Sequence, residues 1–84
     1  MNITFKLYAS LTQYLPAEAQ RSNQMALDVA PGASIADIVA PFGMPPKLVH
    51  LVLVNGVYIY PADRPTRTLV AGDVLAIWPP IAGG

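Results

Sequence analysis

Apolar and polar residues alternate at the start of the chain. Ile3, Phe5 and Leu7 are apolar. The alternate positions are mainly polar: Asn2, Thr4, Lys6 and Tyr8. A period of two places one face of a strand on a core. The alternation returns over residues 24–29, which Pro31-Gly32 closes. The pattern therefore predicts two strands, residues 2–8 and 24–29, each with one buried face.

The segment between these strands has a weaker helical pattern. Ser10 and Gln13 have the spacing of a capping box, and the apolar residues within 10–15 recur at helical intervals. We expect a short helix here that Pro16 stops. Residues 17–23 carry no clear period, and we predict a loop.

A better-defined helix begins after Ser34. The Ser34 hydroxyl is a suitable N-cap, and Asp37 occupies the third helical position, where a carboxylate meets the positive end of the helix dipole. Pro41 should end or kink this helix near Ala40. The apolar residues that form its packing stripe are Ile35, Ile38, Val39 and Phe42.

Three further strands are predicted in the second half of the chain. Residues 49–54 form a nearly continuous apolar run, as expected of an interior strand. Asn55-Gly56 is a strong hairpin signal, so residues 57–60 should return antiparallel to that run. Residues 61–68 contain prolines and charges and are predicted to cross the surface irregularly. Residues 74–78 are apolar on both sides, which favours a central strand.

This order of elements predicts an α+β protein. One main helix packs on one face of a mixed sheet of about five strands, and a β-grasp arrangement fits the order. The last strand, being central, pairs most naturally beside the first. We therefore expect a β-grasp domain over residues 1–78 and a flexible, extended C-terminal tail over residues 79–84.

Composition narrows the function classes. The 84 residues include five basic and five acidic side chains, so the formal net charge is zero and no broad field attracts nucleic acid or an anionic membrane. The absence of cysteine excludes a thiol nucleophile and thiolate metal sites. Only 12% of residues are charged while 54% are hydrophobic, which predicts that some apolar surface faces a partner.

Targeting signals are also missing from the pattern. The alternating N-terminus is unlike a signal peptide, and no stretch approaches the roughly 20 apolar residues of a membrane helix. We therefore expect a cytoplasmic protein.

Few side chains are candidates for chemistry. His50 is the only histidine, which favours a structural or surface role. Lys47, Arg64 and Arg67 could meet an acidic partner, although a solvated loop is the favoured interpretation. The carboxylates that fall at predicted turns or caps, and so do not predict a paired acid/base site, are Asp28, Asp37, Asp63 and Asp73.

Three aromatic residues are candidates for contact with a partner. Tyr58 and Tyr60 are two residues apart and so share one strand face, where sheet or core packing is favoured over partner contact. Trp78 stands at the base of the tail, and its position suits both the edge of the core and a docking anchor.

The last residues form the most suggestive motif. After Trp78, Pro79-Pro80 holds the backbone extended, and Ile81 and Ala82 precede Gly83-Gly84. Residues 79–84 can span about 20 Å, enough to enter a partner's active site. Glycine lacks a Cβ, so a narrow channel can close on the backbone. Terminal glycines are also common in passive chain ends, which remains the alternative.

These features resemble the MoaD/ThiS sulfur-carrier family, ubiquitin-like β-grasp proteins that end in Gly-Gly. The resemblance covers nearly the whole chain, and an aromatic residue followed by Pro-Pro is closest to the small subunit of molybdopterin synthase (MoaD type). Trp78 stands where Phe is usual, and the ending Ile-Ala-Gly-Gly also resembles the thiamine-pathway carriers. The segments that carry the resemblance are the first strand, the helix after residues 31–34, residues 50–56, residues 69–74 and the tail.

The resemblance implies a reaction at the terminal carboxylate of Gly84. An adenylating enzyme, which uses ATP and magnesium, would join Gly84 to AMP. A sulfur donor would then displace AMP, and the thiocarboxylate would give its sulfur to a precursor on the large subunit of molybdopterin synthase. Residues 79–83 would thread the partner's channel and Trp78 would dock. The chain would bind no cofactor and supply no catalytic side chain. Alternatives are a carrier for thiamine or another sulfur pathway, a protein modifier joined to lysines, and a passive binding module.

Overall fold

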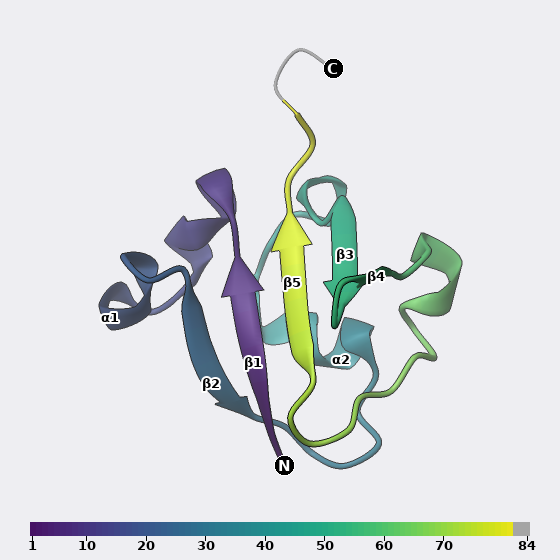
Figure 1. The fold of residues 1–84 in the computed structure, drawn as a ribbon. Coiled ribbons are helices and arrows are strands. Elements are labelled where there is room, and N and C mark those ends of the chain that lie inside the picture. The colour runs from purple at the N-terminus through teal and green to yellow at the C-terminus, as the bar shows by residue number, and fades with distance from the viewer. Residues whose placement is uncertain (82–84) are drawn as a thin grey trace.

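The computed structural model describes residues 1–81, and in this part of the chain the strands form one mixed sheet (Figure 1). The strand order is β2-β1-β5-β3-β4. β5 lies in the centre, parallel to β1 and antiparallel to β3, whereas β1–β2 and β3–β4 are antiparallel pairs. The bounds are β1 Asn2–Leu7, β2 Gln24–Asp28, β3 Leu51–Val54, β4 Val57–Tyr58 and β5 Val74–Trp78.

The central position of β5 follows from its sequence. Leu75 and Ile77 are completely buried on the core side, and Ala76 on the other side is also buried. Only a strand with neighbours on both edges and apolar contacts on both faces can bury such a run. The predicted α+β class, the β-grasp order and the pairing of the last strand with the first are confirmed.

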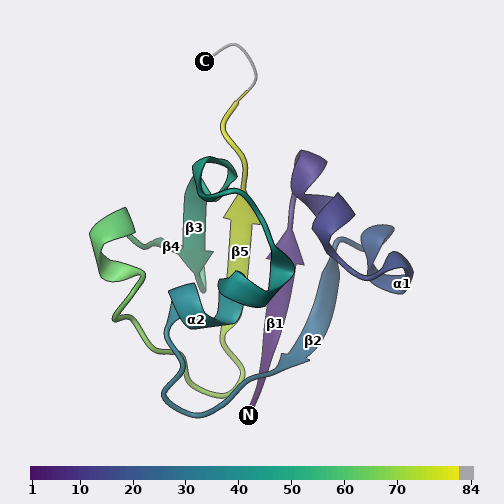
Figure 2. The same cartoon turned by 180° about the vertical axis from the view of Figure 1, so that it is seen from behind.

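The main helix, α2 (Ile35–Val39), covers one face of the sheet (Figure 2). The predicted Ser34 cap is confirmed, and Asp37 completes it as a capping box: the Asp37 amide donates to Ser34 Oγ, and the Ser34 amide donates to Asp37 Oδ2, both at 3.1 Å. The α-helix ends before Pro41, as expected, and continues as the 3₁₀ helix η2 (Ala40–Phe42). Gly43 then ends the turn with a left-handed φ of 73°.

A single core lies between the sheet and α2. The Phe5 and Phe42 rings pack with centroids 4.6 Å apart, which joins the centre of β1 to the segment after α2. The largest completely buried side chains are Phe5, Leu7, Leu11, Ile35, Val52, Val54, Leu75 and Ile77.

Two short segments differ from the prediction. The helix after β1 is a 3₁₀ helix, η1 (Ala9–Tyr14), without a side-chain cap, so the Ser10–Gln13 capping box was wrong. A one-turn α-helix, α1 (Ala17–Gln20), replaces the predicted loop. Tertiary contacts stabilise this turn, because Ala19 is buried and Gln20 Nε2 donates to the carbonyl of Leu15 at 3.0 Å.

The strands around the hairpin are shorter than predicted. Val49 is the C-cap of the 3₁₀ helix η3 (Pro46–Leu48), so β3 begins only at Leu51. Tyr60 is the N-cap of another 3₁₀ helix, η4 (Pro61–Asp63), which follows the two-residue β4. Proline at the start of each 3₁₀ helix fixes φ near a helical value and favours these turns over extended strand.

The predicted hairpin at Asn55-Gly56 is confirmed, and it is tied to β5. Both residues have positive φ, 52° and 82°, as a type I′ turn requires. Asn55 Nδ2 donates to Asp73 Oδ1 at 2.9 Å, and the Val74 amide donates to Asn55 Oδ1 at 2.8 Å. These bonds fix the start of the central strand.

No helix in residues 1–81 combines the length and hydropathy that a bilayer crossing needs.

Candidate functional site

The central strand carries the chain off one end of the sheet. Trp78 is the last residue of β5, and residues 79–81 continue beyond the sheet, seen as the yellow segment above it in Figure 1. Pro79 is half-buried and Pro80 exposed, while Ile81 is 84% exposed and has left the body of the protein. Ala82, Gly83 and Gly84 lie outside the described residues, so their threading role and the chemistry of Gly84 stay predictions.

Trp78 stacks on Tyr8 at the base of this exit. The two rings are almost parallel, with an interplanar angle of 5° and centroids 3.9 Å apart. Backbone hydrogen bonds fix the pair, because the Tyr8 amide donates to Ile77 O at 3.1 Å and the His50 amide donates to Trp78 O at 3.2 Å. Trp78 is half-buried and lies outside the core cluster. It therefore lies on the face of the sheet that α2 does not cover, which we call the uncovered face, rather than in the core.

An apolar surface extends from this stack across β3 and β4. Trp78 is paired with Leu51, and Leu53 is paired with both Ala76 and Tyr58, so their side chains share the face opposite α2. Tyr60 continues the surface, with its ring edge-on to Tyr58 at 5.0 Å and 84°. We call this surface the apolar face; it consists of Tyr8, Leu51, Leu53, Tyr58, Tyr60 and Trp78.

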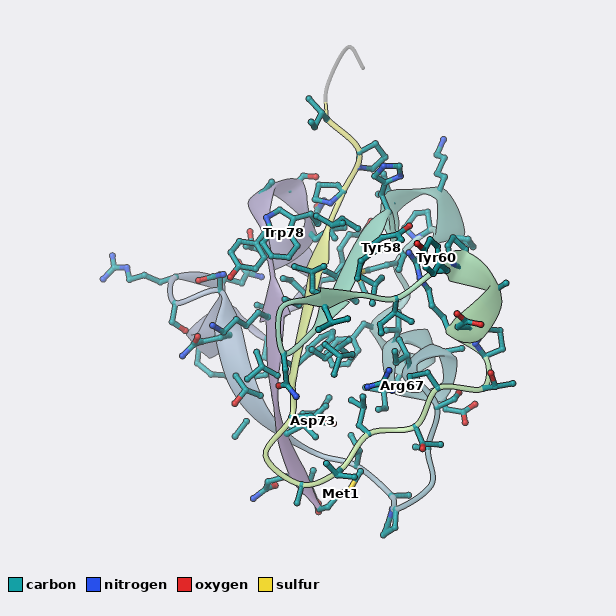
Figure 3. The ribbon with its side chains drawn as sticks, turned by 45° about the vertical axis from the view of Figure 1, so that its right-hand side comes forward. Met1, Tyr58, Tyr60, Arg67, Asp73 and Trp78 are labelled. Carbon is teal, nitrogen blue, oxygen red and sulfur yellow. The ribbon has the colours of Figure 1, made fainter. Side chains whose placement is uncertain are left out.

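The apolar face and the exit lie at the same end of the sheet. Figure 3 shows Trp78, Tyr58 and Tyr60 in the half of the molecule from which residues 79–81 leave, and Asp73 and Met1 at the other end. The same side of β1 and β2 is polar: Lys6 lies between Gln24 and Ala76 in the cross-strand row. The uncovered side of the sheet is thus divided, with its apolar half next to the exit.

Sequence reasoning found only part of this surface. It singled out Trp78, Tyr58 and Tyr60, but Leu51 and Leu53 were absorbed into an interior strand. The signal was present, because a strand that buries one face needs only alternate apolar positions, and residues 51–54 are apolar throughout. Tyr8 was placed among the polar positions of the first strand, although it is aromatic.

The basic side chains have different roles. Arg64 is half-buried and donates three hydrogen bonds to carbonyls: Nε to Ile59 at 3.1 Å, Nη1 to Val49 at 2.9 Å and Nη2 to His50 at 3.0 Å. It joins the segment after β4 to the start of β3, so the solvated-loop interpretation was wrong for Arg64. Arg67 and Lys47 are exposed, as that interpretation expected.

The carboxylates serve structure. Asp37 caps α2, and Asp73 accepts from the Val70 amide and from Asn55 Nδ2, both at 2.9 Å. The Val70 bond first, then the Asn55 bond and to a lesser degree Arg67 hold the pKa of Asp73 below its usual value of 3.8, although burial opposes them. His50 is exposed. Residues 1–81 bring together no group of three acidic, histidine or cysteine side chains that could hold a metal ion.

Comparisons with known proteins agree with this fold. The chain is similar to small archaeal modifier protein 1 (SAMP1) of Haloferax volcanii, with 26% identity, a TM-score of 0.66 and full coverage of both chains. A second structure of that protein gives 26% identity and a TM-score of 0.64, with 95% of this chain and 98% of the other covered. The HVO 2177 protein of Haloferax volcanii, 20% identical, shares the fold with a TM-score of 0.70 over 100% of this chain and 87% of its own.

At the sequence level, no curated protein matches the chain significantly. The sequence profile of the Mut7-C ubiquitin family matches residues 1–82, nearly the entire chain but not Gly83-Gly84. The chain therefore belongs to the Mut7-C ubiquitin family and has a ubiquitin-like β-grasp fold.

Proposed function

We propose that the chain is a sulfur carrier that reacts through the carboxylate of Gly84 and serves as the small subunit of a molybdopterin synthase. The observation that carries the proposal is the position of the exit. β5 is held on both edges by hydrogen-bonded neighbours, and it ends beside the apolar face. A partner that binds this face would hold the body of the protein while residues 79–84 reach into its active site.

The chemistry needs no side chain of the carrier. A glycine carboxylate is ionised at neutral pH and is a poor electrophile. In the proposed activation, a carboxylate oxygen of Gly84 attacks the α-phosphorus of ATP and pyrophosphate leaves. Hydrosulfide released by a sulfur donor then attacks the carbonyl carbon, the acyl–phosphate bond breaks and AMP leaves, which gives the C-terminal thiocarboxylate. The partner enzyme supplies ATP, magnesium and the acid–base groups.

The tail sequence supports the assignment to molybdopterin synthesis. The aromatic residue Trp78 followed by Pro79-Pro80 resembles the MoaD-type ending more than the shorter thiamine-pathway carriers. On this proposal the partners are an adenylating enzyme of the ubiquitin-activating type, a sulfur donor and a large synthase subunit that accepts the tail. A carrier for thiamine or another sulfur pathway would use the same first step and would differ in the protein that captures the tail.

A second candidate function is protein modification. The neighbour SAMP1 is described as a small archaeal modifier protein and is 26% identical across the full length of this chain. A modifier would use the same adenylate, but a lysine amine would attack it or a thioester made from it, and an isopeptide bond would form at Gly84. Conjugates that survive a denaturing gel would identify this outcome.

The first step can be tested by ATP–pyrophosphate exchange. The chain ending at Gly84, mixed with the adenylating enzyme of its own organism, should support exchange that depends on both proteins. A variant lacking Gly84 should abolish exchange while the amide spectrum of residues 1–78 stays unchanged. If truncation after Pro80 leaves the chain as active as before, the tail is passive and the chain is a binding module.

A further inference from the structure

The edge of the sheet farthest from β4 has unpaired backbone groups. Within residues 1–81, β2 pairs only with β1. The Val29 amide donates to Met1 O at 2.8 Å, and the Leu7 amide donates to Asn23 O at 3.0 Å. The odd-numbered residues of β2 therefore point their backbone N–H and C=O groups toward β1. In an antiparallel pair the alternate residues point their amides and carbonyls away from the neighbour. Ala26 and Asp28 therefore present N–H and C=O groups at a free edge.

A groove of about 600 Å³ lies at the C-terminal end of this edge. It runs between β2, the loop that follows it, and the side of α2 and η2. Several lining residues are partly exposed members of the core, so an entering side chain would contact core atoms directly. These residues are Leu27, Val29, Ala33 and Phe42.

The charge of the groove has one sign. The two charged residues that line it, Asp28 and Asp37, are both acidic. By strand alternation the Asp28 side chain lies on the other face of β2 from Leu27, at the rim of the groove. The Asp28 side chain is 84% exposed, and its Oδ1 accepts a hydrogen bond from the Met1 ammonium at 2.9 Å. Asp37 uses its Oδ2 to cap α2. Each carboxylate keeps a second oxygen that can accept a hydrogen bond. A ligand with a basic residue at its end complements this rim.

We propose that the β2 edge and its groove bind an extended peptide segment of a partner protein, added to the sheet as a sixth strand. Its backbone pairs with Ala26 and Asp28, alternate apolar side chains enter the groove, and a flanking Lys or Arg meets Asp28 or Asp37. Main-chain pairing gives affinity and the pockets for alternate side chains give specificity. The site is at the sheet edge beside β1, whereas the apolar face extends over β3 and β4, so both can be occupied together.

A second copy of the chain fits the edge less well. Pairing β2 with β2 of another copy would satisfy the free backbone groups. However, the β2 side chains on the groove side, Met25 and Leu27, already pack against the core of their own chain. They are not available to fill the groove of a neighbour, which favours a separate extended segment.

The test uses a library of blocked eight-residue peptides with Val, Ile, Leu or Phe at alternate positions and Lys at one end. Binding to the 15N-labelled chain should shift amides of residues 26–33 and slow hydrogen exchange at Ala26 and Asp28. Ala26→Pro removes an outward amide without touching the β1 ladder and should weaken binding at least tenfold. Ala26→Val, which keeps the amide, should bind as the wild type does. Asp28→Lys should weaken binding of the basic peptides.

A control independent of the protein's folding uses the selected peptide itself. N-methylation of its backbone amides on the paired side should abolish binding to the wild type, whereas methylation on the other side should not. The proposal is overturned if no library member binds, if Ala26→Pro binds equally well, or if the shifts centre on Tyr58 and Trp78. It is also overturned if the wild type forms a dimer in sedimentation that Ala26→Pro abolishes, since the occupant would then be a second copy.

Discussion

Tyr8 and Trp78 stack face to face, 3.9 Å between ring centroids, at the point where the last strand leaves the sheet. Tyr8 directly follows β1 and Trp78 ends β5, and the parallel pairing of these strands brings the two rings together. The stack lies at the base of residues 79–81 and forms one end of the apolar face. It therefore joins the proposed docking surface to the proposed reactive tail.

Removing the indole should affect both stability and docking. Trp78→Ala deletes a half-buried ring and its stacking contact with Tyr8, and we expect a loss of about 2 kcal/mol in the free energy of unfolding. Affinity for the adenylating enzyme should fall at least tenfold. Trp78→Phe, which keeps an aromatic ring on Tyr8, should retain most of the stability and most of the affinity. Urea unfolding and calorimetric titration measure the two effects separately, and normal affinity in a folded Trp78→Ala variant would remove Trp78 from the docking surface.

The division of the uncovered sheet side gives a matched pair of variants. Leu53 and Gln24 belong to the same cross-strand row, one on the apolar face and the other on the polar half. Leu53→Arg should reduce affinity for the adenylating enzyme at least tenfold, because it places a charge at the centre of a desolvated contact. Gln24→Arg adds the same charge and should change affinity less than twofold. Equal effects of the two variants would mean that long-range charge, not the apolar face, governs binding.

Acid stability should depend on Asp73. Its pKa is lowered in the folded chain because Val70 N–H and Asn55 Nδ2 stabilise the charged form. The stabilisation is complete above the unfolded value, about 3.9, and is lost as the pH falls through the lower folded value. Asp73→Asn should cost about 1–2 kcal/mol at neutral pH. Unfolding free energies of the two proteins, measured from pH 7 downward, should converge in acid; a constant difference would exclude this titration.

Arg64 should be more important for stability than its loop position suggests. Arg64→Ala leaves the carbonyls of Val49, His50 and Ile59 without their donor, and we expect a loss of about 2–3 kcal/mol. Lysine cannot reproduce the planar fork, so Arg64→Lys should recover only part of this loss. Arg67→Ala, three residues along the same segment, should change stability by less than about 0.5 kcal/mol. Similar urea midpoints for Arg64→Ala and Arg67→Ala would contradict this role.

Most of the architecture could be predicted because its signals are local. The alternation around Phe5, the Ser34–Asp37 cap and the Asn55-Gly56 turn each specify their own backbone, and the two-sided apolar run at residues 74–78 predicts the central strand. The one-turn helix at residues 17–20 could not be predicted, because it depends on the burial of Ala19 and on a side-chain bond from Gln20 to the carbonyl of Leu15. Its sequence alone is compatible with loop.

The site was predictable only in part for a similar reason. The tail motif is contiguous, so Trp78 and the residues after it stand out in the sequence. The apolar face is assembled from β3, β4, β5 and the segments that follow β1 and β4. Its members become neighbours only through the register of β5 with β1 and β3. Arg64 was misjudged because a charged residue between prolines is usually solvated, and two of its three carbonyl partners, Val49 and His50, come from a distant segment.

The proposed function requires Gly84 to be the reacting residue. Its most direct test is the intact mass of the chain purified from cells together with its own adenylating enzyme and sulfur donor. The account predicts a form in which one C-terminal oxygen has been replaced by sulfur, located at Gly84 by fragmentation and missing when the adenylating enzyme is deleted. If the chain carries only an ordinary carboxylate under these conditions, the sulfur-carrier function is contradicted.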